Sequence, residues 1–132
     1  MAAELNGFDL ALLQARNWAH FAVNGADGYP HVTVVWVDAD DTHVLINSAA
    51  GRVKDLAVQR DPRVSVSVHD QEDPLRFVSI RGVVEARETG PDAERLIDTL
   101  SRKYDGEPWE PVEGQVRVTY RIRPEFIIRH DG

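Results

Sequence analysis

Apolar and polar residues alternate in several short segments of this chain, which is the pattern of a β-strand with one buried face. RVSVSVH at residues 63–69 is the clearest case, because valine occupies every second position. HVTVVWV at residues 31–37 is apolar on both faces, which predicts a strand that is covered on both sides. The same criteria predict further strands at residues 18–24, 42–48, 75–87 and 115–129, the last interrupted at Pro124.

Two other segments carry their apolar residues at helical spacing. Residues 91–104 give the stronger signal, because a proline stands near the start, acids fill the first turn and bases fill the last turn. Residues 8–16 place phenylalanine and leucines on one side of a helix. Both segments are therefore predicted to be helices that pack against the strands.

A third, shorter helix is predicted between Arg52 and Pro62. The proline ends it, because the residue before a proline avoids the helical region. Three apolar residues fall at i, i+3 and i+4 and should form the face that holds this helix on the sheet, namely Val53, Leu56 and Ala57.

Six strands joined mostly by short turns, with three helices, predict a mainly β (α+β) fold. The short turns favour an antiparallel barrel with helices at its ends or sides over a parallel sheet. Gly82 interrupts the longest strand and predicts a bulge or a barrel corner there. The length of 132 residues favours one domain over residues 1–132.

Composition and charge exclude several classes of protein. The formal net charge of −7 argues against a general nucleic-acid-binding protein, which needs a basic face. Cysteine is absent, which excludes disulfides and thiolate chemistry and fits a reducing compartment. The first residues lack the pattern of a signal peptide, and no apolar run approaches the length of a membrane span. We therefore expect a cytoplasmic protein without membrane association.

The common catalytic signatures are missing from the sequence. There is no phosphate-loop motif, no GxSxG and no HExxH. The five histidines show no metal-ligand spacing, so we expect no metal site. No catalytic side chain can be assigned, and we expect the three tryptophans to serve in core or interface packing.

Arg52 and Lys54 have the wrong sign for their position at the start of the short helix. A helix N-terminus is itself partially positive, so a cation there typically costs about 0.3–1 kcal/mol. One interpretation is that both side chains reach solvent or pair with an acid such as Asp55. The other is that an anion binds at this helix start, where free N–H groups already favour a phosphate. Gly51 would then let the backbone approach the anion closely, and Ser48 would add a hydroxyl donor.

Four segments, in this order, resemble the pyridoxamine-phosphate-oxidase-like split β-barrel family: GYPHVTVVW, VLINSAAGRVKDLAVQRDPRVSVSV, FVSIRGVVE and LIDTLSRKYDG. The resemblance covers roughly residues 8–130. It is greatest to the branch of small oxidoreductases that use the deazaflavin coenzyme F420. The ordered set is more specific for the family than for the cofactor.

This resemblance implies a six-stranded split barrel with Greek-key character, a homodimer and two cofactor sites at the dimer interface. By the same match, Arg52 and Lys54 would bind the cofactor phosphate, while Asn47 and Ser48 would donate hydrogen bonds. The strand from His31 to Trp36 would run along the cofactor ring. The ring would lie nearest to Val32 and Thr33, and Phe77 would approach it from the second subunit.

Three functions remain open at this point. The first is a reductase that passes a hydride from reduced coenzyme F420 to a small electrophilic molecule, without an essential protein nucleophile. The second is an FMN-dependent oxidase or reductase on the same barrel. The third is a flavin or deazaflavin carrier or binding module without turnover. The loops that would select a substrate carry no readable signature.

Overall fold

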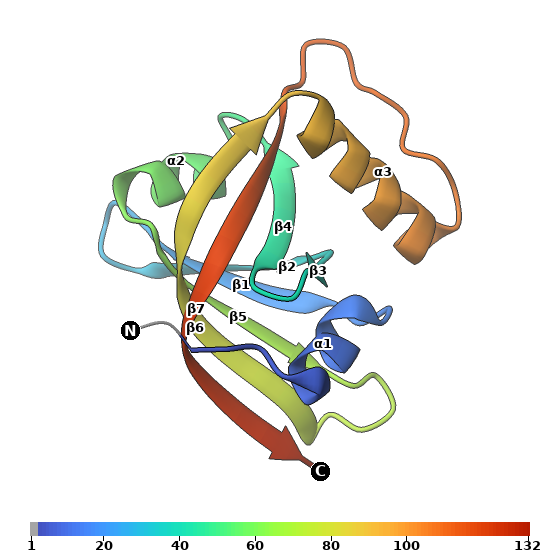
Figure 1. Ribbon diagram of the computed structural model, residues 1–132. Helices are drawn as coiled ribbons and strands as arrows, with labels where there is room; N and C mark the ends of the chain where they lie inside the picture. Colours follow the sequence, from blue (N-terminus) through green and yellow to red (C-terminus); the bar gives the residue numbers. More distant parts are fainter. Residues whose placement is uncertain (1–2) are drawn as a thin grey trace.

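The computed structural model describes residues 3–132 as one antiparallel sheet with three helices (Figure 1). The helices are α1 Gly7–Gln14, α2 Val53–Arg60 and α3 Pro91–Asp105. The strands are β1 Ala19–Asn24, β2 Pro30–Val35, β3 Asp38–Ala39, β4 Val44–Ala49, β5 Arg63–His69, β6 Arg76–Thr89 and β7 Arg117–Asp131. All the helices and the longer strands therefore lie where the sequence pattern predicts them.

The predicted mainly β, antiparallel architecture with three helices is confirmed, but the structure has neither six strands nor a closed barrel. The sheet has seven strands in the order β2-β1-β5-β6-β7-β4-β3, and β2 and β3 form its free edges. The additional strand, Asp38–Ala39, is only two residues long and pairs with the start of β4. Residues 38–41, DADD, contain three aspartates in four positions, a composition typical of a turn, so the pairing cannot be recognised from the sequence.

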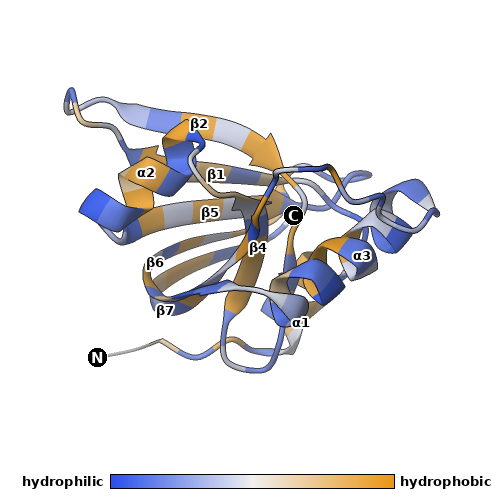
Figure 2. Cartoon of the chain, turned by 90° about the horizontal axis from the view of Figure 1, so that it is seen from above, coloured by the Kyte–Doolittle hydropathy of each residue, from blue (hydrophilic) through white to orange (hydrophobic). Residues whose placement is uncertain are grey.

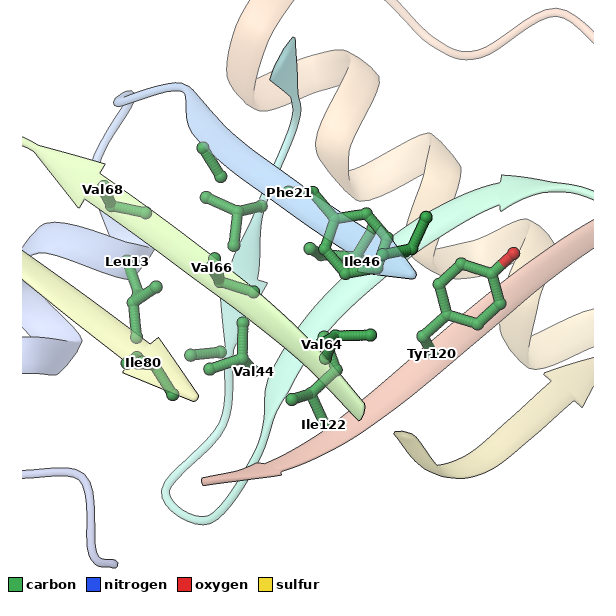
Figure 3. Packing of buried hydrophobic residues seen from close by; sticks show 14 of the residues in the cluster. Leu13, Phe21, Val44, Ile46, Val64, Val66, Val68, Ile80, Tyr120 and Ile122 are labelled. Carbon is green, nitrogen blue, oxygen red and sulfur yellow. The ribbon is translucent and has the colours of Figure 1, made fainter. Parts of the chain in front are cut away.

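The open sheet is nevertheless strongly curved. The ring centroids of Phe21 on β1 and Tyr120 on β7 lie 6.1 Å apart, although two strands separate β1 from β7 in the sheet. The sheet thus folds over on itself, and its concave face encloses the aliphatic core seen in Figure 3. Tyr120 stands at the edge of that core with its hydroxyl pointing away from the aliphatic side chains (Figure 3). The hydroxyl therefore remains available to a polar partner.

Gly82 lies at the place where β6 and β7 bend. The pairing register shifts between Arg81 and Gly82, which confirms the predicted bulge. Pro124 lies opposite Gly82, and β7 continues through it as one strand, not two. A proline donates no ladder hydrogen bond, so the bulge lets the strand pass without a break in the sheet.

The three helices are fixed in different ways. An Asn6–Asp9 capping box begins α1, and Arg129 donates to both carboxylate oxygens of Asp9 at 2.7 and 2.8 Å. The helix α3 buries one face against β4, β6 and β7. The helix α2 lies next to β1 and β2, away from α1 and α3 (Figure 2). Among residues 3–132 no helix is long and apolar enough to cross a bilayer.

The predicted apolar face of α2 is confirmed at Ala57 and wrong for Val53 and Leu56. Val53 and Leu56 are 64% and 51% exposed, whereas Asp55, Ala57 and Val58 are buried. A hydrogen-bonded carboxylate on the inner side of the helix, described below, sets this orientation in place of the valine and leucine. Burial of those two apolar side chains therefore does not fix α2 within this chain.

We predict that Gly82→Ala destabilises the protein by roughly 1–3 kcal/mol, as overpacking of a tight site does. A Cβ atom at this position would lie 2.5 Å from the carbonyl oxygen of Arg123 and 2.9 Å from a methyl group of Ile122. Urea unfolding measures the change. Gly7→Ala is the matched control, because nothing lies within 4 Å of a Cβ there. Equal stability of the two variants would contradict the role given to the bulge.

Candidate functional site: a basic cavity at the start of a helix

A cavity of about 460 Å³ opens between the start of α2, the end of β2, β4, β7 and α3. Three cationic side chains line it, those of Arg52, Lys54 and Arg117. None of the residues that line it carries a carboxylate. In a protein with a formal net charge of −7, this is a local concentration of positive charge. Such a site attracts anions.

Arg52 and Lys54 form no salt bridge within residues 3–132. The interpretation that they pair with Asp55 does not hold, because that carboxylate has other partners. Arg87 on β6 donates to it through Nε and Nη2 at 2.8 and 2.7 Å. The two cations at the start of α2 are therefore left without an acidic partner.

The Asp55 carboxylate connects α2 to the sheet. Its side chain is fully buried and accepts five hydrogen bonds, two from Arg87 and one each from Tyr120, Gly51 and Gln59. The Tyr120 hydroxyl donates at 2.8 Å and the Gly51 backbone N–H at 2.9 Å. The bond to Gly51 ties the residues before the helix to its first turn. Asp55 thus fixes the backbone that carries Arg52 and Lys54.

The titration of this network follows from its hydrogen bonds. The side-chain bonds from Arg87 lower the pKa of Asp55 to about 2, against the opposing effect of burial. Burial raises the pKa of Tyr120, and the negative charge of Asp55 raises it further. Asp55 is therefore charged, and Tyr120 protonated, throughout the physiological range.

The side chains of Lys54 and Arg117 are partly buried, and each lies near other positive charges. Burial lowers the pKa of Lys54, and the charges of Arg52 and Arg117 lower it further. Burial also lowers the pKa of Arg117, again with a contribution from Arg52. Arg117 donates only to neutral oxygens, those of Asn47 at 2.9 Å and Gln115 at 3.0 Å. An anion in the cavity would relieve this repulsion.

The first turn of α2 has free backbone donors next to the side chains of Arg52 and Lys54. The N–H groups of Val53 and Lys54 have no hydrogen-bond partner in the described part of the chain. Arg52 occupies the N-cap position and makes no side-chain capping bond, so the usual cap is absent. Gly51 has a φ of +87°, a conformation that favours glycine. The helix start is thus arranged to accept an external anion.

Asn47 and Ser48 point to opposite faces of β4. Asn47 lines the cavity and donates to the carbonyl oxygen of Ala93 at 2.9 Å and to Thr119 at 3.2 Å. It therefore joins α3 to the sheet and orients Arg117. Ser48 is buried on the core side and does not line this cavity.

The residues expected along β2 are spread over several environments. Val34, Val35 and Trp36 at its end line the basic cavity. His31 lines a different cavity with Val53 and Leu56. Val32 and Thr33 line neither cavity. The side chain of Val32 is exposed, and the hydroxyl of Thr33 is buried without a hydrogen-bond partner in residues 3–132.

The three tryptophans do not belong to the core. Trp18, Trp36 and Trp109 are each partly exposed, and all three line the basic cavity. Trp18 and Trp36 nevertheless pack on the buried ring of Tyr104, as expected of packing residues, and an interface role for the three tryptophans stays a prediction. Phe77 does not line this cavity and stacks on His130 with ring centroids 5.4 Å apart.

Arg117 is the cationic residue of the cavity that could not be found from the sequence. In the sequence it is simply an arginine near the start of a predicted strand. In the structure it is buried, as are the next three residues, Val118, Thr119 and Tyr120. The pairing of Ala49 with Arg117 brings it beside the start of α2. That pairing joins segments 68 positions apart (117 − 49) and cannot be read from local pattern.

Comparison with known proteins gives a consistent set of relatives. Residues 9–126 match the family described as pyridoxamine 5′-phosphate oxidase. Comparison with curated proteins gave no match.

Several solved structures share the fold. A protein described as an F420 reductase has a TM-score of 0.83 and 27% identity, covering 94% of this chain and 98% of that one. A conserved hypothetical protein from Mycobacterium tuberculosis has a TM-score of 0.68 and 25% identity, covering 94% and 81% of the two chains. A FAD-binding protein from Mesorhizobium loti has a TM-score of 0.61 and 26% identity, covering 96% and 95%.

We predict that Asp55→Asn lowers the free energy of unfolding by about 3 kcal/mol at pH 7, as loss of one partner of a buried ion pair does. Asp92→Asn is the matched control, because that carboxylate is 76% exposed and pairs with Arg95 on the surface of α3. It should change stability by less than about 1 kcal/mol. Urea unfolding measures both variants.

The same network predicts a dependence on pH. Because the pKa of Asp55 is lowered to about 2 in the folded protein, its stabilisation is complete above about pH 4. This stabilisation is lost as the pH falls from about 4 through about 2. Between these pH values the free energy of unfolding of Asp55→Asn should therefore fall less than that of the unmodified protein. Parallel acid-unfolding curves for the two proteins would rule out this role of Asp55.

Proposed function

Since this chain belongs to the pyridoxamine 5′-phosphate oxidase family, we propose that it is an oxidoreductase that uses coenzyme F420 and holds the phosphate of this coenzyme in the basic cavity. The observation that carries the proposal is the set Arg52, Lys54 and Arg117 without any lining carboxylate. The relative described as an F420 reductase, at 27% identity, supports the choice of cofactor.

The residues present fit a phosphate group. Lysine and arginine give charge-assisted hydrogen bonds, which are stronger than neutral ones. The free N–H groups of Val53 and Lys54 and the helix dipole act on the same anion. Asn47 would orient Arg117, and Ser48, on the core side of β4, would support the strand from within.

The strand β2 fits the expected place of the cofactor ring. It is an edge strand, so one side of its backbone has no ladder partner in the sheet. The backbone of Val32 and Thr33 would meet the polar edge of the ring, with His31 at the end of the strand. When bound in its reduced form, coenzyme F420 supplies a hydride to a small electrophilic organic molecule. The chain would bind and orient both molecules and exclude water, and we assign no catalytic side chain.

We propose a homodimer in which the second copy covers the convex face of β2, β1, β5, β6 and β7. Val32, Val34, Phe126 and Ile128 are exposed on this face. Phe77 lies on the same face, in register with His69 and His130. Phe77 would therefore approach the cofactor of the other subunit.

FMN is the second candidate cofactor. The FAD-binding relative, at 26% identity, and the family itself favour a flavin in this fold. The phosphate of FMN would use the same cations, so the cavity alone does not separate the two cofactors. A carrier protein without turnover would bind either cofactor equally well. It would differ from an oxidoreductase in that it reduces no substrate.

We predict that Lys54→Ala weakens binding of the cofactor by roughly 10- to 150-fold, which corresponds to about 1.5–3 kcal/mol for a charge-assisted hydrogen bond. The stability of the empty protein should be unchanged or higher, because burial and two neighbouring cations disfavour charged Lys54. Fluorescence titrations with coenzyme F420 and, separately, with FMN measure the affinity.

Arg60→Ala is the matched control. This substitution also removes one positive charge from α2, but from its last turn, and Arg60 does not line the basic cavity. It should leave the affinity for cofactor nearly unchanged. Absence of binding of either cofactor at micromolar concentration refutes the proposal. Unfolding of Lys54→Ala with unchanged affinity in the folded fraction would make Lys54 a structural residue.

A further inference from the structure

A second cavity, of about 490 Å³, opens beside the turn that joins β3 to β4. It shares no lining residue with the basic cavity. Its volume lies in the range of cavities that bind small ligands. Leu5 and Pro124 give it apolar walls, and Thr42, His43 and Glu85 add polar groups. It therefore offers room for a small organic molecule next to groups that can transfer a proton.

Thr42, His43 and Glu85 form a continuous chain of hydrogen bonds in this cavity. The ring of His43 lies 2.6 Å from Glu85 through Nε2 and 2.8 Å from the Thr42 hydroxyl through Nδ1. Because a carboxylate only accepts, Nε2 of the neutral imidazole carries the proton and Nδ1 keeps a free lone pair. The Thr42 hydroxyl therefore donates to Nδ1. The order hydroxyl, imidazole, carboxylate is the one by which enzymes activate an alcohol as a nucleophile.

Asp40 fixes the turn that presents the exposed side chain of Thr42. One oxygen of Asp40 accepts from the backbone N–H groups of Thr42 and His43 at 2.9 and 2.7 Å, and Arg121 donates to the other oxygen at 2.7 Å. The first oxygen also lies 3.2 Å from the Thr42 hydroxyl, farther than Nδ1 of His43. His43 is thus the nearer acceptor, and backbone bonds hold the turn without the hydroxyl.

Glu85 is carried by a second bulge in β6. The register of β6 with β7 shifts between Val84 and Ala86, which leaves Glu85 without a residue opposite it. A bulge re-aims a side chain, and bulges are frequent next to active sites. The hydrogen bond from His43 lowers the pKa of Glu85, so this carboxylate is charged at neutral pH and orients the imidazole.

Arg123 brings a positive charge to the same cavity. The pairing of β4 with β7 ends at Val44 and Ile122, so the next residues, His43 and Arg123, are neighbours across the two chain segments. In the described part of the chain, the only carboxylate within salt-bridge distance of Arg123 is that of Glu125, at 3.7 Å. The guanidinium can therefore stabilise negative charge that develops on a carbonyl oxygen in the cavity.

The other lining residues indicate the class of ligand. The carboxylates of Glu4 and Asp41 disfavour an anion. Leu5 and Pro124 offer apolar contact to a short chain of carbon atoms. An uncharged molecule with a short apolar group fits these walls best.

We propose that Thr42, His43 and Glu85 form an acyl-transfer site that hydrolyses small uncharged carboxylic esters. The Oγ1 atom of Thr42 forms a bond to the carbonyl carbon of the ester, and its proton passes to Nδ1 of His43. The bond from that carbon to the alcohol oxygen breaks, and the alcohol leaves with the proton. Water then gives a proton to His43 and attacks the acyl carbon. The acyl bond to Thr42 breaks as His43 returns the proton, which releases the carboxylic acid.

Hydrolysis of p-nitrophenyl acetate by the full chain tests this proposal. Thr42→Val and His43→Gln should each lower kcat/KM by roughly 100-fold or more, as loss of general acid–base catalysis does. Thr42→Ser keeps a hydroxyl and should retain the activity. Thr89→Val is the matched control, because it makes the same change at an exposed threonine that ends β6 outside this cavity. It should leave the rate unchanged.

Glu85 acts through His43 and is a positioning residue. Glu85→Gln should lower kcat by about tenfold or more and leave KM unchanged, because the substrate does not touch this side chain. Mass spectrometry of peptides after an acid quench should find an acetyl group on Thr42 in the unmodified protein and none there in His43→Gln.

Two results would overturn the proposal. One is equal hydrolysis by Thr42→Val and the unmodified protein, with both shown to be folded by urea unfolding. The other is an acetyl group that forms on another residue and not on Thr42. Lys54→Ala should leave hydrolysis unchanged, because Lys54 lines only the basic cavity. If neither coenzyme F420 nor FMN binds while hydrolysis behaves as expected, the proposed cofactor is wrong and the acyl-transfer site remains.

Discussion

The buried carboxylate of Asp55 is the interaction on which the arrangement of this site depends. Arg87 donates two hydrogen bonds to it, and Tyr120 and Gly51 donate one each, so α2 is tied to β6, to β7 and to its own preceding turn. Because this acid is fully satisfied, it does not neutralise the cations beside it in sequence. The helix start therefore keeps its positive charge and directs it into the cavity.

A polar attachment has consequences that an apolar one would not have. A hydrophobic face tolerates small rotations, whereas a carboxylate that accepts five hydrogen bonds fixes the helix about its axis. The cost is that Val53 and Leu56 remain exposed. The stability of α2 and the affinity for an anion thus have separate sources, which allows each to be altered independently.

Much of this fold can be predicted from the sequence, because the local signals agree with the final packing. The alternation at residues 63–69 gives β5 with the bounds that the structure shows, and Gly82 marks the bulge that curves the sheet. The cations Arg52 and Lys54 are recognisable because they contradict the helix dipole. Arg117 and the three tryptophans are not, since they meet at the cavity only through pairing of β4 with β7 and packing of α3.

A crystal structure of the protein grown with coenzyme F420 would show whether the cofactor phosphate binds in the basic cavity. We predict phosphate density within hydrogen-bond distance of Lys54 and Arg117, at the N–H groups that begin α2, with the Asp55–Arg87 pair unchanged. A cofactor bound elsewhere on the protein, with the basic cavity holding only solvent, would contradict the account.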